Sequence, residues 1–305
     1  MHTVRTVCAL REPLGPARRE GRRIGLVPTM GALHDGHLAL IARAREQCDV
    51  VVVTLFVNPT QFDERADLER YPRRERDDAE RAAAAGADVL FAPSVEEVYP
   101  DGFATSVRVG GVSEHLEGRA RGPEHFRGVA TVVTKLLCMA LPDVAYFGQK
   151  DAQQLSVIRR LTRDLNLPAR IEAVPTVREP DGVAMSSRNA LLSPAQRGQA
   201  RALPAALAAA RELAADGERS TPALLARARA AMEPFDVRPE YLALVDPDTF
   251  EPLERLDGQA LLALAARIGD VRLIDNTTLA PSPARGAHEN TSDPTQGEAM
   301  ATCSA

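Results

Sequence analysis

Residues 27–37 read Val-Pro-Thr-Met-Gly-Ala-Leu-His-Asp-Gly-His, and this stretch decides the fold of the first part of the chain. It follows a short apolar run at residues 24–27 and contains the proline and glycines of a tight turn. It precedes Leu38, Ile41 and Cys48, whose spacing is that of one face of a helix. The stretch therefore predicts a buried strand, a turn and a helix.

Two histidines, His34 and His37, lie one helical turn apart at the start of this predicted helix. Free amides and the helix dipole make a helix N-terminus a natural anion site, and Gly36 would let a ligand approach the backbone closely. A single histidine at such a turn is usually a structural hydrogen-bonding residue. Because two of the six histidines fall here, the pair favours a site that binds a phosphate or another small anion.

A continuous apolar, β-branched run at residues 49–57 is typical of a strand covered by helices on both faces. The polar loop that follows contains Gln61. This loop lies at the carboxyl end of the predicted strand, where open α/β sheets bind their ligands. We therefore expect Gln61 either to hydrogen-bond a substrate or to be an ordinary solvent-exposed loop residue.

A second strand, glycine and helix start follow at residues 144–154. Lys150 is suited to a phosphate, Asp151 to a ribose hydroxyl, and Gln154 would face the same opening from the next turn. The alternative is a surface Lys–Asp pair. Only two of the 37 basic residues are lysines, Lys135 and Lys150, and a lysine offers a compact point charge that arginine cannot copy. Both turns should lie at one edge of a parallel sheet.

The remaining segments of the first part supply further elements. We expect helices at residues 77–85 and 126–141, strands at 88–92 and 170–176, and a small hairpin or edge strand at 105–112. The predicted fold class is therefore α/β, a Rossmann-like parallel sheet with helices on both faces.

After residue 194 the composition shifts to alanine, leucine and arginine. Helical and strand patterns alternate there in the manner of a smaller α+β domain. The expected elements are helices at 194–215, broken at Pro204, and 221–232, and strands at 241–245, 260–268 and 271–279. The predicted division is a Rossmann-like substrate-binding domain at 1–177, a C-terminal lid domain at 178–280 and a disordered tail at 281–305.

Residues 178–189 form a polar loop with turn residues, two serines and an arginine. Such a loop can close over a triphosphate, although a Ser-Ser-Arg turn is often only a turn. Asp77 and Asp78 are weak candidates for Mg²⁺ ligands, because adjacent carboxylates on a helix point in different directions. A solvated charged face is the simpler interpretation of that helix.

The composition excludes several classes of function. A net charge of −5 argues against nucleic acid as a partner, because phosphate neutralisation needs a clustered basic face. No apolar run is long enough to span a membrane, and the first residues lack a signal core, so we expect a cytoplasmic protein. Its four cysteines, Cys8, Cys48, Cys138 and Cys303, are far apart, which predicts buried free thiols.

Several motifs occur in a fixed order and together resemble the pantothenate synthetase (pantoate–β-alanine ligase) family. This family belongs to the nucleotidyltransferase superfamily with HIGH- and KMSKS-type motifs. The resemblance extends over residues 6–279. It is carried by PTMGALHDGH at 28–37, FVNPTQF at 56–62, RYPR at 70–73, HFRGV at 125–129, FGQKD at 147–151, QQL at 153–155, PTVREPDG at 175–182 and MSSRN at 185–189.

The resemblance implies an ATP-dependent C–N ligase that joins (R)-pantoate to β-alanine through a pantoyl adenylate and releases AMP and pyrophosphate. It implies that His37, with His34, Lys150 and Arg188, is catalytic and that Gln61 and Gln154 bind pantoate and β-alanine. The ATP-binding residues implied are Met30, Gly31, Ala32, Leu33, His34, Asp35, Gly36, His37, Gly148, Gln149, Lys150, Asp151, Val177, Met185, Ser186, Ser187 and Arg188.

The resemblance also implies Mg²⁺ with the ATP and a homodimer, with residues 105–112 as an interface edge by analogy. Two departures limit it. Arg81 replaces a neutral side chain near Asp77 and Asp78, and the segment 118–125 is one residue longer than usual, so its arginines have no implied role. The alternatives are another adenylate-forming nucleotidyltransferase or a non-catalytic nucleotide sensor.

Overall fold

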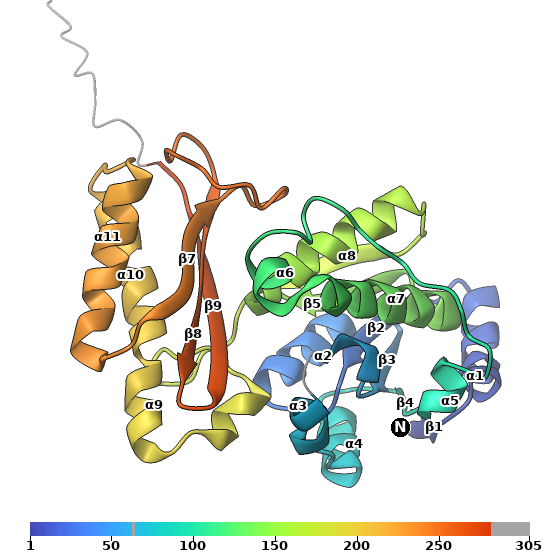
Figure 1. Ribbon diagram of the computed structural model, residues 1–305. Helices are drawn as coiled ribbons and strands as arrows, with labels where there is room; N and C mark the ends of the chain where they lie inside the picture. The colour runs from blue at the N-terminus through green and yellow to red at the C-terminus, as the bar shows by residue number, and fades with distance from the viewer. Residues whose placement is uncertain (63–64, 282–305) are drawn as a thin grey trace, which may run out of the picture.

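The computed structural model describes residues 1–62 and 65–281 of the 305-residue chain as two packed units (Figure 1). The first unit is built on a six-stranded sheet and the second on a three-stranded sheet. The predicted tail lies outside the described residues apart from Pro281.

The first sheet is wholly parallel. Its strands, in spatial order, are β1 (His2–Val4), β4 (Val89–Phe91), β3 (Val50–Leu55), β2 (Ile24–Thr29), β5 (Val144–Gly148) and β6 (Arg170–Val174). The strand order reverses at β2, so β2, β3 and β5 open their carboxyl ends beside one another, at the place where such sheets bind ligands.

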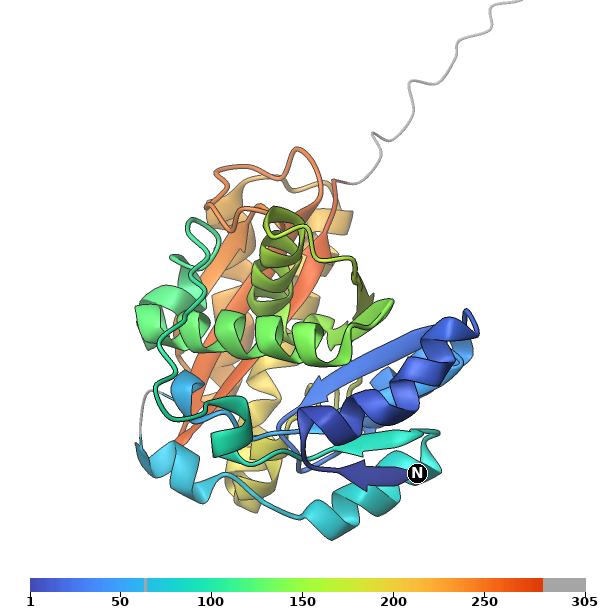
Figure 2. The same cartoon turned by 90° about the vertical axis from the view of Figure 1, so that its right-hand side faces the viewer.

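Both faces of this sheet are covered by helices, as predicted. Val50 and Val52 of β3 belong to one hydrophobic cluster, whereas Val51 and Val53 belong to another, because successive side chains point to opposite faces. The first cluster includes α1 (Val7–Arg19), α7 (Pro123–Ala140) and α8 (Ala152–Asp164), and the second includes α2 (Asp35–Gln47) and α4 (Glu75–Ala84). Figure 2 shows the helices on the two sides of the sheet. The shorter helices of this unit are α3 (Arg65–Arg70), α5 (Val95–Val98) and α6 (Leu116–Arg121), with 3-10 turns η1 (Pro59–Gln61) and η2 (Gln149–Asp151).

The second unit is a smaller antiparallel sheet backed by helices. Its strands, β7 (Pro239–Val245), β8 (Ala260–Ile268) and β9 (Val271–Leu279), pair in chain order, and one face packs on α10 (Ala202–Ala215) and α11 (Thr221–Met232). The opposite face presents Leu261 and Ala263 to the core of the first unit. The two units therefore share a buried apolar contact. The remaining elements are η3 (Ser187–Leu191), α9 (Pro194–Ala200) and η4 (Glu233–Phe235).

The strand predicted at residues 105–112 is absent, and that prediction was wrong. Val109 and Val112 are buried against α7, and the amide of Val107 donates to Thr131 Oγ1 of that helix at 2.9 Å. The apolar residues of this segment thus pack onto α7, and residues 105–112 form no strand. It therefore offers no sheet edge for a dimer interface.

Two helix predictions also need correction. The break expected at Pro204 lies at Arg201, between α9 and α10, because a proline clashes with the carbonyl four residues earlier and is tolerated in the first turn. Helix α1 was not predicted, since Pro13 and Pro16 lie inside it. Its face of Leu10, Leu14 and Ala17 is fully buried, and this packing outweighs the poor helix propensity.

The cysteines are free among the described residues, but only Cys48 is buried. Cys8 and Cys138 are exposed, so the prediction that they are buried was wrong. Within residues 1–62 and 65–281, no helix is long and apolar enough to cross a membrane. The cytoplasmic location stays a prediction.

Candidate active site

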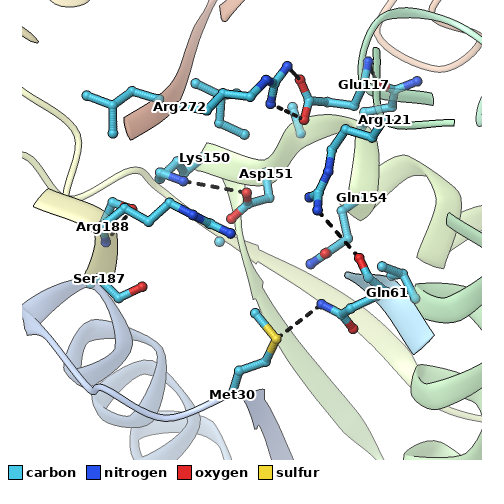
Figure 3. Close-up of a pocket in the computed structure, with 18 of the residues that line it drawn as sticks. Met30, Gln61, Glu117, Arg121, Lys150, Asp151, Gln154, Ser187, Arg188 and Arg272 are labelled. Atoms are coloured by element: carbon cyan, nitrogen blue, oxygen red, sulfur yellow. Dashed lines mark hydrogen bonds and ion pairs between the residues drawn. The ribbon is translucent and has the colours of Figure 1, made fainter. Parts of the chain in front are cut away.

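A pocket of about 670 Å³ opens where the carboxyl edge of the parallel sheet meets the second unit. Figure 3 shows side chains from both units facing it. Three segments singled out by the sequence line it: the turn after β2, the turn after β5, and the loop before η3. Strand β9 closes the side that faces the second unit.

Two side chains of α4 hold the turn after β2 in place by hydrogen bonds. Gly31 and Ala32 both have positive φ, of 91° and 51°, and the second value is unfavourable for a residue with a Cβ. The carboxylate of Asp78 accepts hydrogen bonds from the amides of Ala32, at 2.9 Å, and Leu33, at 2.7 Å. Arg81, one turn further along α4, donates to the Leu33 carbonyl at 3.2 Å.

The two histidines form the cap of helix α2. His34 is its N-cap residue, and His34 Nδ1 accepts from the Gly36 amide at 3.2 Å. His37 Nδ1 accepts from the His34 amide at 3.3 Å, and the two ring centroids lie 4.1 Å apart. Since both Nδ1 atoms accept, a neutral imidazole at either position carries its proton on Nε2. The pair therefore offers two Nε2–H donors.

Burial keeps these imidazoles uncharged at neutral pH. Burial, followed by the nearby His34, lowers the pKa of His37 to about 3. The pKa of His34 is also lowered, first by burial and then by the positive charge of Lys150. Both side chains line the pocket. They are hydrogen-bond donors there, and neither carries the extra proton that an acid catalyst would donate at neutral pH.

The imidazole of His34 fills the space that a side chain at position 36 would need. A Cβ at this position would lie 2.8 Å from the His34 ring, so Gly36 is required for the ring to fold over the helix start. From the sequence, a ligand was expected in that space. The glycine is needed, but the group it admits is an imidazole.

The turn after β5 places one cation in the pocket. Lys150, in η2, is mostly buried, and Lys150 Nζ lies 3.5 Å from Asp151 Oδ1. Its backbone is held from the second unit, because Asn276 Nδ2 of β9 donates to the carbonyls of Gln149, at 3.0 Å, and Lys150, at 2.8 Å. The position of this lysine therefore depends on the second unit.

Gln61 occupies the opposite wall (Figure 3). Its Oε1 accepts from Asn58 Nδ2 at 3.0 Å, and its Nε2 lies 3.1 Å from Met30 Sδ. His125 Nδ1 is 2.8 Å from the Gln61 carbonyl, and Arg121 donates to the same oxygen at 3.4 Å. This wall is thus built from hydrogen bonds that join η1 to the turn after β2, to the end of α6 and to the first turn of α7.

Helix α7 approaches this wall very closely. A Cβ at Gly128 would lie 2.3 Å from the Thr60 carbonyl oxygen, so only glycine fits. Asn58, 1% exposed, spans the contact by donating to the Gly128 carbonyl at 3.2 Å. Gly128 therefore fixes the position of Gln61 without contacting the pocket.

A buried ion pair joins the two units at the rim (Figure 3). Arg272 of β9 donates to both oxygens of Glu117 of α6, at 2.7 and 2.8 Å, and Tyr241 Oη donates to Glu117 Oε1 at 2.8 Å. Burial alone would raise the pKa of the Glu117 carboxyl. The hydrogen bonds and charge of Arg272 outweigh burial and hold that pKa below its ordinary value.

The loop before η3 is tied at both ends. Arg178 makes a bidentate ion pair with Asp275, at 2.6 and 2.9 Å, and Asn189 Nδ2 donates to Glu179 Oε1 at 2.7 Å. Between these ends, Ser186 Oγ accepts from the Arg188 amide at 3.3 Å. The loop therefore reaches the pocket as a formed structure.

Most of the residues implied for ligand binding line this one pocket. They are Met30, His34, Gly36, His37, Gln61, Gly148, Lys150, Asp151, Gln154, Val177, Met185, Ser186, Ser187 and Arg188. Five others do not line it: Gly31 and Ala32 form the turn, Leu33 packs in the core, and Asp35 and Gln149 are exposed. The structure thus separates groups that face the pocket from groups that shape it.

Several residues that build the site were not predicted from the sequence. Arg121 and His125 lie in a segment left without a role, and Asn58 and Gln153 lie in quoted motifs without one. Gln153 Oε1 accepts from the Glu117 amide at 2.9 Å, while its Nε2 donates to two carbonyls. For Asn58 and Gln153, an amide side chain beside a predicted turn is the signal in the sequence that could have indicated a role.

No group of three or more potential metal ligands occurs among the described residues. Asp77 is exposed, and both oxygens of Asp78 accept backbone amides. Neither aspartate lines the pocket. The two therefore do not fit a magnesium site, even as weak candidates.

The fold and the pocket together define a class, that of nucleotide-binding enzymes with a Rossmann-like sheet and a smaller second domain. Comparison with known proteins goes further. The model of the pantoate-beta-alanine ligase family matches residues 2–278. The chain belongs to this family of ATP-dependent ligases.

Relatives agree over nearly the full length. A pantothenate synthetase from Moorella thermoacetica is 51% identical over 92% of this chain and 99% of its own. Pantothenate synthetase 1 from Bradyrhizobium diazoefficiens is 53% identical over 93% and 100%. The structure is similar to the Thermus thermophilus pantothenate synthetase, with a TM-score of 0.87 and 47% identity over 92% of this chain and 100% of that one.

A more distant structure was determined with ligands. It is the pantoate-beta-alanine ligase from Francisella tularensis, complexed with beta-gamma ATP and beta-alanine. The TM-score is 0.75 and the identity 33%, over 91% of this chain and 97% of that one.

Proposed function

We propose that this protein condenses (R)-pantoate with β-alanine at the expense of ATP, through a pantoyl adenylate, in a pathway that makes pantothenate. The observation that carries the proposal is that the two turns predicted to bind anions and the loop before η3 line one pocket in a chain of this family. In this proposal residues 1–177 bind the substrates and residues 178–280 act as a lid.

In the first step a carboxylate oxygen of pantoate attacks the α-phosphorus of ATP, and pyrophosphate leaves. Negative charge moves onto the leaving group. The Nε2–H donors of His34 and His37 and the cations of Lys150 and Arg188 stabilise that charge, which is the main requirement of this reaction. The neutral imidazoles are supported as donors by the two Nδ1 contacts.

Pantoate is assigned to the wall that carries Gln61 and Gln154. Their amides suit its hydroxyls and carboxylate, while Val129, Val132 and Leu136 of α7 line the same pocket and suit its two methyl groups. In the second step the amine of β-alanine attacks the acyl carbon of the adenylate, and AMP leaves. Water must be excluded during this step, since it would hydrolyse the intermediate.

Mg²⁺ is assigned to the phosphates of ATP, where it would neutralise charge. Magnesium commonly binds through substrate phosphates and water with few protein ligands. A homodimer is also proposed, from the family alone. Sedimentation equilibrium would test it, and a mass of one chain at micromolar concentration would overturn it.

Two alternatives are not favoured by relatives that are more than half identical over nearly the whole chain. One is a different adenylate-forming enzyme, and the other is a non-catalytic nucleotide sensor. Exchange of labelled pyrophosphate into ATP tests all three. We expect exchange that requires pantoate; exchange without pantoate, or with an amino acid in its place, would overturn the proposal.

A further inference from the structure

Side chains of helix α4 hydrogen-bond to the turn before His34 from outside the pocket. Asp78, 2% exposed, accepts the amides of Ala32 and Leu33 on its two oxygens, and Arg81 donates to the Leu33 carbonyl. The carboxylate and the guanidinium lie three positions apart, hence on one face of the helix. Two side chains thus hold three polar groups of two consecutive residues.

This turn needs an external hold. Ala32 has a φ of 51°, a conformation that a residue with a Cβ adopts only when its surroundings impose it. The Asp78 carboxylate also restrains the chain just before α2. His34, which follows Leu33, is the N-cap residue of that helix, and its amide donates a hydrogen bond to His37 Nδ1. A shift of the turn would therefore move both imidazoles.

We propose that Asp78 and Arg81 are positioning residues, which set the imidazoles of His34 and His37 by fixing the backbone of Ala32 and Leu33. The proposal deepens the proposed function and rests on it, because it assumes that these imidazoles act on the phosphates. Neither Asp78 nor Arg81 lines the pocket.

The competing role for Asp78 is that of a Mg²⁺ ligand. Its two oxygens each already accept a backbone amide at 2.9 Å or less, and Arg81 brings a positive charge to the next turn of the same helix. Asp77, which would complete a carboxylate pair, is exposed on another face. The surroundings of Asp78 are those of a structural anchor.

The main experiment compares Asp78→Asn with Asp77→Asn in pantoate-dependent ATP–pyrophosphate exchange. An asparagine at position 78 keeps the shape but offers one acceptor where two amides need two. We expect kcat to fall on the order of 100-fold, as displacement of a catalytic group by about 1 Å does, and Asp77→Asn to stay within about twofold of the wild type. Equal effects in the two variants, or none in Asp78→Asn, would overturn the proposal.

Two further readouts separate positioning from metal binding. The Mg²⁺ concentration for half-maximal exchange should be unchanged in Asp78→Asn, whereas loss of a metal ligand would raise it about 10-fold or more. Imidazole ¹⁵N resonances of His34 and His37, recorded without ATP or metal, should shift in Asp78→Asn and not in Asp77→Asn. Unshifted resonances with a raised Mg²⁺ requirement would assign Asp78 to the metal.

A milder variant covers the case in which Asp78→Asn does not fold. Arg81→Met removes only the bond to the Leu33 carbonyl, so exchange should fall by about threefold to tenfold, in proportion to one hydrogen bond, with the same two resonances shifted. Unshifted resonances would overturn the proposal. His37→Ala, measured in parallel, tests the proposed function itself: normal exchange there would remove the imidazole from the reaction, while the resonances would still report the coupling.

Discussion

The wall of the pocket that carries the two histidines and the wall that carries Lys150 are held in different ways. The turn with His34 and His37 is fixed within the first unit, by Asp78 and by the cap of α2. The turn with Lys150 is held across the unit boundary, by Asn276 of β9. The histidine wall is therefore formed within the first unit alone, whereas the lysine wall also needs the contact with β9 of the second unit.

This difference suggests a division between the wall that binds ATP first and the wall that is completed when the second unit closes. In the proposed lid mechanism, the histidine wall would receive ATP before closure, because its hydrogen bonds do not involve β9. In the same mechanism, the lysine wall would reach its final geometry on closure, when water must be excluded. Variants of the first wall should change the chemical step, and variants of the second should change closure and stability.

The largest effect should come from the preformed wall. His37→Ala removes a donor from the developing charge, so we expect pantoate-dependent exchange to fall about 10²- to 10³-fold. His2→Ala, on the distant strand β1, is the control and should leave the rate unchanged. Single-turnover rates of adenylate formation close to the wild type would contradict the role of His37.

The ion pair between the units should dominate their stability. Arg272→Met leaves the buried Glu117 carboxylate without its countercharge, and we expect a loss of about 3 kcal/mol in the free energy of unfolding. Arg267→Met removes a neighbouring arginine that is half-exposed and pairs with Glu240, so it should cost less than about 1 kcal/mol. Urea unfolding measures both, and similar losses would refute the distinction.

Acid should weaken the histidine wall. The pKa of His37 is about 3 in the folded protein and about 6.5 when unfolded, so the unfolded chain binds more protons between these values and stability falls as pH drops below 6.5. At pH 5 this contributes a loss of about 2 kcal/mol. His37→Gln should show a correspondingly flatter dependence of unfolding free energy on pH. Parallel curves for variant and wild type would show that this histidine is not the source.

The smallest effect should report on closure. Asn276→Ala removes two hydrogen bonds to the carbonyls of Gln149 and Lys150, and we expect kcat/KM for ATP to fall about tenfold. Thr278→Ala, at an exposed position of the same strand, is the matched control. An unchanged kcat/KM in Asn276→Ala would mean that Lys150 holds its place without the second unit.

The sequence predicted the parts of the fold that depend on local pattern. The apolar, β-branched run at 49–57 predicted a strand covered on both faces, which is β3, and β8, β9 and α11 have the predicted bounds. The segment 105–112 failed because weak alternation does not distinguish an edge strand from irregular chain packed on a helix. Helix α1 was missed because its burial, which outweighs two prolines, depends on α7.

The candidate site divides in the same way. Side chains that follow a strand directly, such as His37, Gln61 and Lys150, could be assigned to the pocket from their place in the chain. Groups that act through distant contacts could not. Glu117 and Arg272 lie 155 positions apart, and nothing in the local sequence of either indicates the other. Asp78 resembled a metal candidate because its backbone partners, 45 and 46 positions earlier, are invisible without packing.

Asp275 and Asn276 are adjacent in β9, yet they contact two points of the chain that are widely separated in sequence. Asp275 pairs with Arg178, where the chain enters the loop before η3, and Asn276 holds the turn that carries Lys150. On heating, detachment of this part of β9 would displace the lysine while the parallel sheet is still intact. Thermal inactivation would then occur at a lower temperature than unfolding of the first unit. The contacts of Asp275 and Asn276 would set the highest temperature at which the enzyme is active.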